Sequence, residues 1–408
     1  MRPSEQLKPL GSSYHRLWTA SAISNLGNGV LFAAMPLLAE SLTSSPTAIS
    51  VVTAATSLPA LLVALHAGVI VDRLDRRRVM IAMDLARLAI LLAFSILVVG
   101  DRVPLGALYV VAFLLGAADV TFDGAARAVV PGLVPIERLD AANGRLAAAS
   151  DTMDELLGPP AGVALFALAA WAPFVFDAGT FATSALLLAT ISGSFRPAHV
   201  RTRLPRSFRR EIAEGVHFVR ESPLLRWLAA ETGMLSLFSS ANIAVLVLFA
   251  LDTLDLPRAG YGYLLMTIAI GGVLGSLSVE RLTRRWRDVD VLTGAVIVNG
   301  AAYVLLAVSR EPVVATIATL LWGGAISTGM IVSIGLRQAR TPDQLLGRVL
   351  SVFGVIVGIG GVFGAVLGGA VADAFGLRAP YVASGVVQLV LAPLFGVALR
   401  RARDEHAG

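Results

Sequence analysis

Three ionisable residues, Asp119, Asp123 and Arg127, recur four positions apart inside the mostly apolar run 105–127. Residues at i, i+4 and i+8 share one face of an α-helix. Asp123 and Arg127 can pair on that face, which leaves Asp119 deeper in the run and freer to bind a proton. Burial favours a neutral carboxyl and a nearby guanidinium favours an ionised one, so a conformational change could move a proton here. The alternative is a static ion pair.

A second acidic group, Asp151, Asp154 and Glu155, opens the apolar run 146–170. Carboxylates in the first turns of a helix are stabilised by its positive end, which is a sufficient structural explanation for Asp151. Glu155 is expected to lie deeper, next to Gly158, and is therefore the better candidate for proton exchange.

Other ionisable residues also lie within apolar runs or near their ends, where an unpaired charge is costly. Asp84 and Arg87 are three positions apart and are predicted to form a local pair with a structural role. Asp177 and Glu231 fit either a structural or a functional role.

Polar and aromatic side chains share one helical face in two of the apolar runs. Such a stripe either lines a cavity or forms hydrogen bonds between helices, and we assign it to a substrate cavity. The residues are Asn25, Asn28 and Phe32 in the run 17–39, and Phe238 and Asn242 in the run 224–250.

Composition decides which elements must hold these residues. The 408 residues are 56% hydrophobic and 15% charged, and the mean hydropathy is +0.76. A water-soluble protein of this composition would expose larger apolar patches than water tolerates, so we predict a multi-pass membrane protein. The basic residues recur in short loops and not over one domain, which argues against a nucleic-acid partner. The absence of cysteine excludes disulfides and thiol chemistry.

Hydropathy predicts twelve transmembrane helices, each about 20 residues long. The runs are 17–39, 49–71, 79–99, 105–127, 146–170, 173–193, 224–250, 261–280, 289–309, 312–336, 346–370 and 379–399. Of 33 basic residues, one set of alternate connections holds only four, which are Arg102, Arg258, Arg310 and Arg378. Because basic loops stay in the cytoplasm, both termini are predicted there, with the chain in the inner membrane.

A tight basic loop between the second and third runs is the most specific motif. Its residues are Gly68, Asp72, Arg73, Arg76 and Arg77. So many arginines cannot lie in hydrocarbon, and they set the topology. Topology alone does not require Gly68 and Asp72 at this spacing, which favours a gate whose carboxylate meets helix N-termini and arginines of the neighbouring bundle.

The same order of residue types recurs in the second half of the chain at 276–285, where an acidic residue is followed by one arginine and then by a pair of arginines. A duplicated six-helix unit is the simplest explanation. We expect a first bundle at 1–195, a connecting segment at 196–223 and a second bundle at 224–408.

Local patterns predict further features of the second half. Residues 208–219 alternate apolar and charged positions at helical spacing, which indicates an amphipathic helix along the cytoplasmic face. Thr341-Pro342-Asp343-Gln344 has the order of a capping box at a helix start. Close helix contacts are predicted by glycines that recur every four residues, which are Gly360, Gly364 and Gly368 in the run 346–370 and Gly271 and Gly275 in the run 261–280.

These motifs resemble the major facilitator superfamily. The basic loop matches the superfamily's signature between helices 2 and 3, and Gly158, Pro159 and Gly162 resemble an element of its proton-coupled drug antiporters. The stretches 214–218 and 337–349 resemble the branch of macrolide-efflux proteins and the enterobactin exporter. The resemblance implies an all-α fold of two six-helix bundles around a central cavity, which opens to either side in turn.

We therefore predict a secondary transporter that exports amphiphilic organic compounds in exchange for protons. A dedicated exporter of a siderophore or other natural product is the alternative. The expected partners are the substrate, protons and membrane lipid, with a monomeric chain and neither cofactor nor metal. An intramembrane enzyme would need a catalytic cluster such as a His-Glu-x-x-His helix, which the sequence lacks. A channel fits the duplicated arrangement less well.

Overall fold

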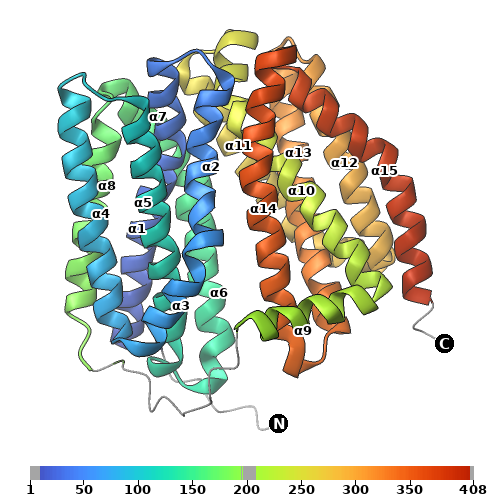
Figure 1. Ribbon diagram of the computed structural model, residues 1–408, viewed down its shortest axis with the longest axis horizontal. Helices are drawn as coiled ribbons and strands as arrows, with labels where there is room; N and C mark the ends of the chain where they lie inside the picture. Colours follow the sequence, from blue (N-terminus) through green and yellow to red (C-terminus); the bar gives the residue numbers. More distant parts are fainter. Residues whose placement is uncertain (1–9, 194, 196–207, 405–408) are drawn as a thin grey trace. The chain divides into compact units, whose positions relative to one another are not determined.

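The computed structural model describes residues 10–193, 195 and 208–404. These residues form fifteen α-helices, short π- and 3-10 segments and no strand, which confirms the predicted all-α class (Figure 1). They divide into two compact units. The first contains residues up to 38 and from 62 to 201, and the second contains 39–61 and the residues from 202 onward.

The first unit is built from most of the first eight helices except α2. Its elements are α1 (Ser12–Leu42, up to residue 38), α3 (Ala64–Arg73), α4 (Arg76–Val99), α5 (Leu105–Val129), η1 (Val130–Gly132), η2 (Ile136–Arg138), α6 (Leu139–Ser150), the π-helix η3 (Asp151–Leu157), α7 (Gly158–Leu168) and α8 (Ala172–Ala189). Helix α4 packs against both α5 and α8, where Phe94 and Phe174 meet edge to face at 5.1 Å.

The second unit contains nearly all of α2 together with the second half of the chain. Its elements are α2 (Pro46–Leu62), α9 (Phe208–Glu221), α10 (Pro223–Leu248), the π-helix η4 (Phe249–Thr253), α11 (Arg258–Arg285), α12 (Asp288–Val308), α13 (Pro312–Arg340), α14 (Asp343–Phe375) and α15 (Ala379–Asp404). Helix α10 packs against α14 and α15, while α13 packs against α11 and α12.

Glycines bring α14 and α10 into backbone contact. A Cβ built on Gly364 would lie 2.1 Å from the carbonyl oxygen of Leu237, and one on Gly368 would lie 2.3 Å from that of Ala241. Both distances are well below van der Waals contact, so only glycine allows this approach. The predicted close contact is confirmed.

Helix α2 is held within the second unit by the far end of α14. Asp373 accepts hydrogen bonds from the backbone N–H of Thr47 at 3.0 Å and from the hydroxyl of Ser45 at 3.2 Å. Two turns further along, Ala54 packs with Ala244 and Ala365. A carboxylate from another helix thus caps the first turn of α2.

Ten of the described helices are long and apolar enough to cross a membrane. Helix α2 and residues 66–73 of α3 form a pair bent by 55° that would make an eleventh span. The run predicted at 146–170 is interrupted by η3, so it consists of α6, η3 and α7. The chain is a multi-span membrane protein, while the count of twelve spans and the side of the termini stay predictions.

The connecting segment forms the predicted amphipathic helix, α9, which runs across the ends of α10 and α14 (Figure 1). Val219 is buried in the core of the second unit. Gly215 lies against the backbone of Arg348 at the start of α14, and Glu214 forms an ion pair with the Arg348 guanidinium. The stretches 214–218 and 337–349 therefore meet in one contact.

The predicted capping box before α14 is wrong. Helix α14 begins at Asp343, one residue later than that pattern requires, and its N-cap is Pro342. The Thr341 hydroxyl donates instead to the carbonyl oxygen of Arg337 at 2.7 Å, because Thr341 follows directly on the last turn of α13. Thr341 thus forms a hydrogen bond with the last turn of α13 and does not cap α14.

Candidate functional site

Arg87 of α4 lies at the centre of a polar site in the first unit. Its side chain is 1% exposed, and it donates to Asp84 at 2.6 Å and to Asp119 of α5 at 3.1 Å. The guanidinium also lies over the rings of Phe122 and Phe181, at 4.7 and 4.1 Å. The predicted Asp84–Arg87 pair is confirmed, but it is part of a larger network that joins α4 to α5 and α8. Two carboxylates and two aromatic faces fix this buried charge.

Asp119 is not the freer carboxylate that the sequence predicts. The oxygen that accepts from Arg87 also accepts from the Asn28 amide of α1 at 2.9 Å. Helices α1, α4 and α5 therefore meet at one carboxylate. The Asp119 side chain is still 39% exposed, so it has an open side as well as a bonded side.

Asp123 and Arg127 form the predicted pair on α5, with 3.6 Å between the carboxylate and the guanidinium. They border a cavity of about 470 Å³ between α3 and α5, and Gly68 and Asp72 of the basic loop motif line the same cavity. Two motifs that the sequence presents separately are thus brought together. The cavity holds two carboxylates and one guanidinium among small side chains.

Two arginines of the basic loop fasten helix ends within the first unit. Arg76 donates to the carbonyl oxygen of Ala128, and Arg77 to that of Ala189, both at 2.7 Å. These carbonyls belong to the last turns of α5 and α8, where cationic side chains are favoured. Arg73 is exposed.

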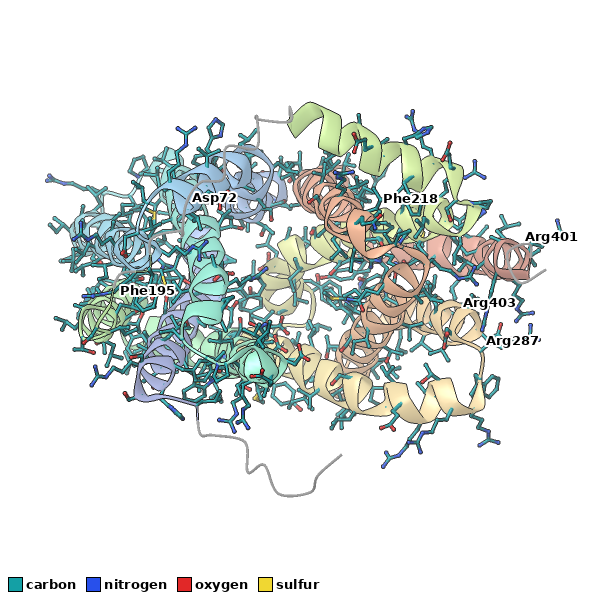
Figure 2. The ribbon with its side chains drawn as sticks, turned by 90° about the horizontal axis from the view of Figure 1, so that it is seen from below. Asp72, Phe195, Phe218, Arg287, Arg401 and Arg403 are labelled. Atoms are coloured by element: carbon teal, nitrogen blue, oxygen red, sulfur yellow. The ribbon has the colours of Figure 1, made fainter. Side chains whose placement is uncertain are left out.

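Asp75, which is not among the residues of the predicted motif, organises the same loop. It caps α4 by accepting from the N–H of Arg78 at 3.2 Å, and it accepts from the N–H of Phe195 at 3.0 Å. Figure 2 shows Asp72 and Phe195 in the first unit, seen from below. An acidic residue directly before an apolar helix is the N-cap signal that could have identified Asp75.

The antiporter-like motif forms a close contact between α1 and α7. A Cβ on Gly158 would lie 2.5 Å from the Cα of Gly29, and one on Gly162 would lie 2.2 Å from the carbonyl oxygen of Val30. Pro159 is buried beside them. The two glycines are therefore required by the helix crossing itself.

The acidic residues near this crossing are arranged differently from the prediction. Glu155 is exposed, whereas Asp154 is half-buried and interacts electrostatically with Asp119 and Asp123. The expectation that Glu155 lies deeper is wrong, and Asp154 takes that place. A π-helix adds a residue to the turn and shifts the face on which each side chain lies.

Asp177 of α8 is buried at the α1 contact. It accepts from the Thr180 hydroxyl at 2.7 Å, and a Cβ on Gly27 would lie 1.6 Å from its Oδ1 atom. Glycine at position 27 therefore leaves space for a carboxyl group between α1 and α8.

The residues assigned to the substrate cavity have different environments. Phe32 is 48% exposed, and Asn25 and Phe238 are half-buried. Asn242 is fully buried, and its side-chain Oδ1 atom accepts from the hydroxyl of Ser384 in α15 at 3.5 Å, while its backbone carbonyl accepts from the hydroxyl of Tyr381 at 2.9 Å. Asn242 thus fits the alternative of bonding between helices, whereas cavity lining stays a prediction for the others.

The chain matches known transporters over nearly its whole length. The sequence model of the transmembrane secretion effector family matches residues 4–407. The multidrug efflux pump Tap of Mycolicibacterium fortuitum is 29% identical over 400 residues, covering 94% of this chain and 95% of Tap. The enterobactin exporter EntS of Shigella boydii is 25% identical over 344 residues, covering 83% and 80% of the two chains.

Solved structures share the fold. A bacterial homologue of the lysosomal transporter Spinster matches with a TM-score of 0.77 at 14% identity, covering 95% of this chain and 96% of that one. A bacterial homologue of ferroportin matches with a TM-score of 0.76 at 16% identity, covering 95% and 100%. The chain belongs to the transmembrane secretion effector family of the major facilitator superfamily.

Proposed function

We propose that this chain exports amphiphilic organic compounds across the inner membrane in exchange for protons. The names of its relatives, a multidrug efflux pump and an enterobactin exporter, support an efflux role. The observation that carries the proton-coupled part is the shared acceptor Asp119, which ties α1 to α4 and α5 through Asn28 and Arg87.

Protonation of Asp119 would loosen this junction. The ionised carboxylate accepts from both Asn28 and Arg87, and hydrogen bonds to a charged acceptor are stronger than those to a neutral one. Arg87 keeps its shorter bond to Asp84, so neutral Asp119 leaves no unpaired guanidinium in the core. A proton can therefore weaken the α1–α5 connection without a large cost elsewhere.

Asp123 and Arg127 give the proton a route from the cavity beside Asp72. They lie one and two turns from Asp119 on α5 and are 47% and 83% exposed. Proton binding would thus be communicated to the basic loop. In this proposal the basic loop acts as the gate, through Gly68, Asp72, Arg73, Arg76 and Arg77. Glu155 remains a predicted contributor to proton exchange.

The substrate would meet an aromatic and amide surface on α1. Exposed Phe32 and half-buried Asn25 offer an apolar face with a polar anchor, which suits hydrophobic compounds and organic cations. The enterobactin exporter match makes a dedicated natural-product exporter the second candidate.

Transport by purified protein in liposomes tests the proposal. With a proton gradient imposed and a fluorescent organic cation as substrate, we expect the wild-type chain to move the cation and the protons in opposite directions, and an uncoupler to stop both. Asp119→Asn and Asp123→Asn should each abolish gradient-driven transport while the cation still binds. Glu221→Gln, in an exposed pair with His217 on α9, is the matched control. Active transport retained by both aspartate variants would refute the coupling role, and transport of enterobactin alone would select the second candidate.

A further inference from the structure

Glu231 of α10 is a buried carboxyl group in the second unit. The residue is 1% exposed, and its Oε2 atom accepts from the hydroxyls of Thr232 and Ser333, both at 3.3 Å. Its Oε1 atom is buried without a hydrogen-bond partner among the described residues. One oxygen of this carboxyl is therefore free to carry a proton.

The guanidinium nearest in the network is separated from Glu231 by a serine. Arg337 of α13 donates to the carbonyl oxygen of Ser333 at 3.0 Å and to its hydroxyl at 3.1 Å, and it lies over the ring of Phe353 at 4.2 Å. The Ser333 hydroxyl in turn donates to Glu231. The Arg337 guanidinium is thus bound by Ser333 and the Phe353 ring. It is linked to the Glu231 carboxyl only through the Ser333 hydroxyl.

Other helices that pack against α10 contribute apolar side chains to the hydrophobic core of the second unit. Val219 comes from α9, Phe353 from α14 and Leu399 from α15. Among the described residues, Arg337 is the charged group that acts on Glu231. A buried carboxylate without a direct ion pair is unfavourable, and the group is more stable when neutral.

We propose that Glu231 holds a proton in this conformation and is a proton-binding site of the second unit. It lies outside the set of first-unit acids to which the proposed function assigns coupling. A shift of α13 along α10 that brought Arg337 directly onto the carboxyl would favour its ionised form and release the proton. The part that this release plays in transport rests on the proposed function, whereas the binding of the proton does not.

Infrared difference spectroscopy of the purified chain in lipid nanodiscs tests the proton site directly. Spectra recorded between mildly acidic and alkaline buffer should contain a protonated-carboxyl component that E231Q loses and the exposed-site control E221Q keeps. Wild-type and E231Q spectra that agree in this region would overturn the proposal. Should E231Q fail to fold, Ser333→Ala keeps the carboxyl and removes one of its donors. A shift in the pH at which the component disappears is then expected, and an unchanged pH would count against the site.

Liposome transport separates this inference from the proposed function. Where the wild-type chain couples protons to substrate, E231Q should move fewer protons per substrate molecule, and an unchanged ratio would remove Glu231 from coupling. Where wild-type transport proves independent of protons, the proposed function fails. The infrared result still decides whether Glu231 binds a proton.

Discussion

Replacing Arg87 with glutamine should destabilise the first unit more than any exposed substitution. The side chain is 1% exposed and pairs with Asp84, which is fully buried. Removing one partner of a buried ion pair costs about 3–5 kcal/mol, because it leaves an uncompensated charge in the core. Asp119 is more exposed and can be hydrated, so we assign most of this cost to Asp84. The two lost ring contacts, to Phe122 and Phe181, act in the same direction.

The double variant Asp84→Asn/Arg87→Gln tests this explanation. It removes the uncompensated carboxylate, so it should recover about 0.5–3 kcal/mol of the loss, which is the range of coupling energies between contacting residues. The assay is thermal and denaturant unfolding in one detergent for the wild type, both single variants and the double variant. Arg284→Gln, from a pair whose side chains are 77% and 75% exposed, should change stability by less than about 0.5 kcal/mol. A double variant less stable than Arg87→Gln alone would refute the reasoning.

Two further predictions concern packing and capping. Gly162→Ala places a Cβ 2.2 Å from the Val30 carbonyl oxygen, where ordinary contact begins at 3.4 Å, and should cost about 1–3 kcal/mol in the same unfolding assay. Gly179→Ala, which meets nothing within 4 Å, should be neutral or slightly stabilising, and equal losses in both variants would contradict the close crossing. Asp373→Ala removes the acceptor for the Thr47 N–H, so it should cost about 0.5–2 kcal/mol and speed hydrogen exchange in the first turn of α2. Unchanged exchange there would show that Asp373 does not cap the helix.

The helices could be predicted from the sequence because length and hydropathy are local signals. Each predicted run coincides with helical structure, and α9 appears where the amphipathic spacing places it. The bend between α2 and α3 and the π-helix η3 could not be predicted, because both depend on what packs against the helix. The π-helix explains the error at Glu155, since the prediction assumed regular helical spacing through residues 151–157.

The candidate site was predictable only where its contacts lie within one helix. The Asp84–Arg87 and Asp123–Arg127 pairs follow from spacings of three and four. The bonds from Arg87 and Asn28 to Asp119 join three helices, and they depend on how each helix is rotated about its axis. Hydropathy does not determine that rotation closely enough to say which residue of a helix faces which neighbour. An arginine in the middle of the apolar run 79–99 was nevertheless a visible signal of a buried partner.

The attachment of α9 to the start of α14 has a practical consequence for exchanging parts between related transporters. Glu214 and Gly215 precede α10 in the chain, but their partner Arg348 lies far along in the second half. A chimaera joined at Pro223 would supply the two sides of this contact from different parents. A junction ahead of Phe208 keeps them together, so the connecting helix is best inherited as the first element of the second half.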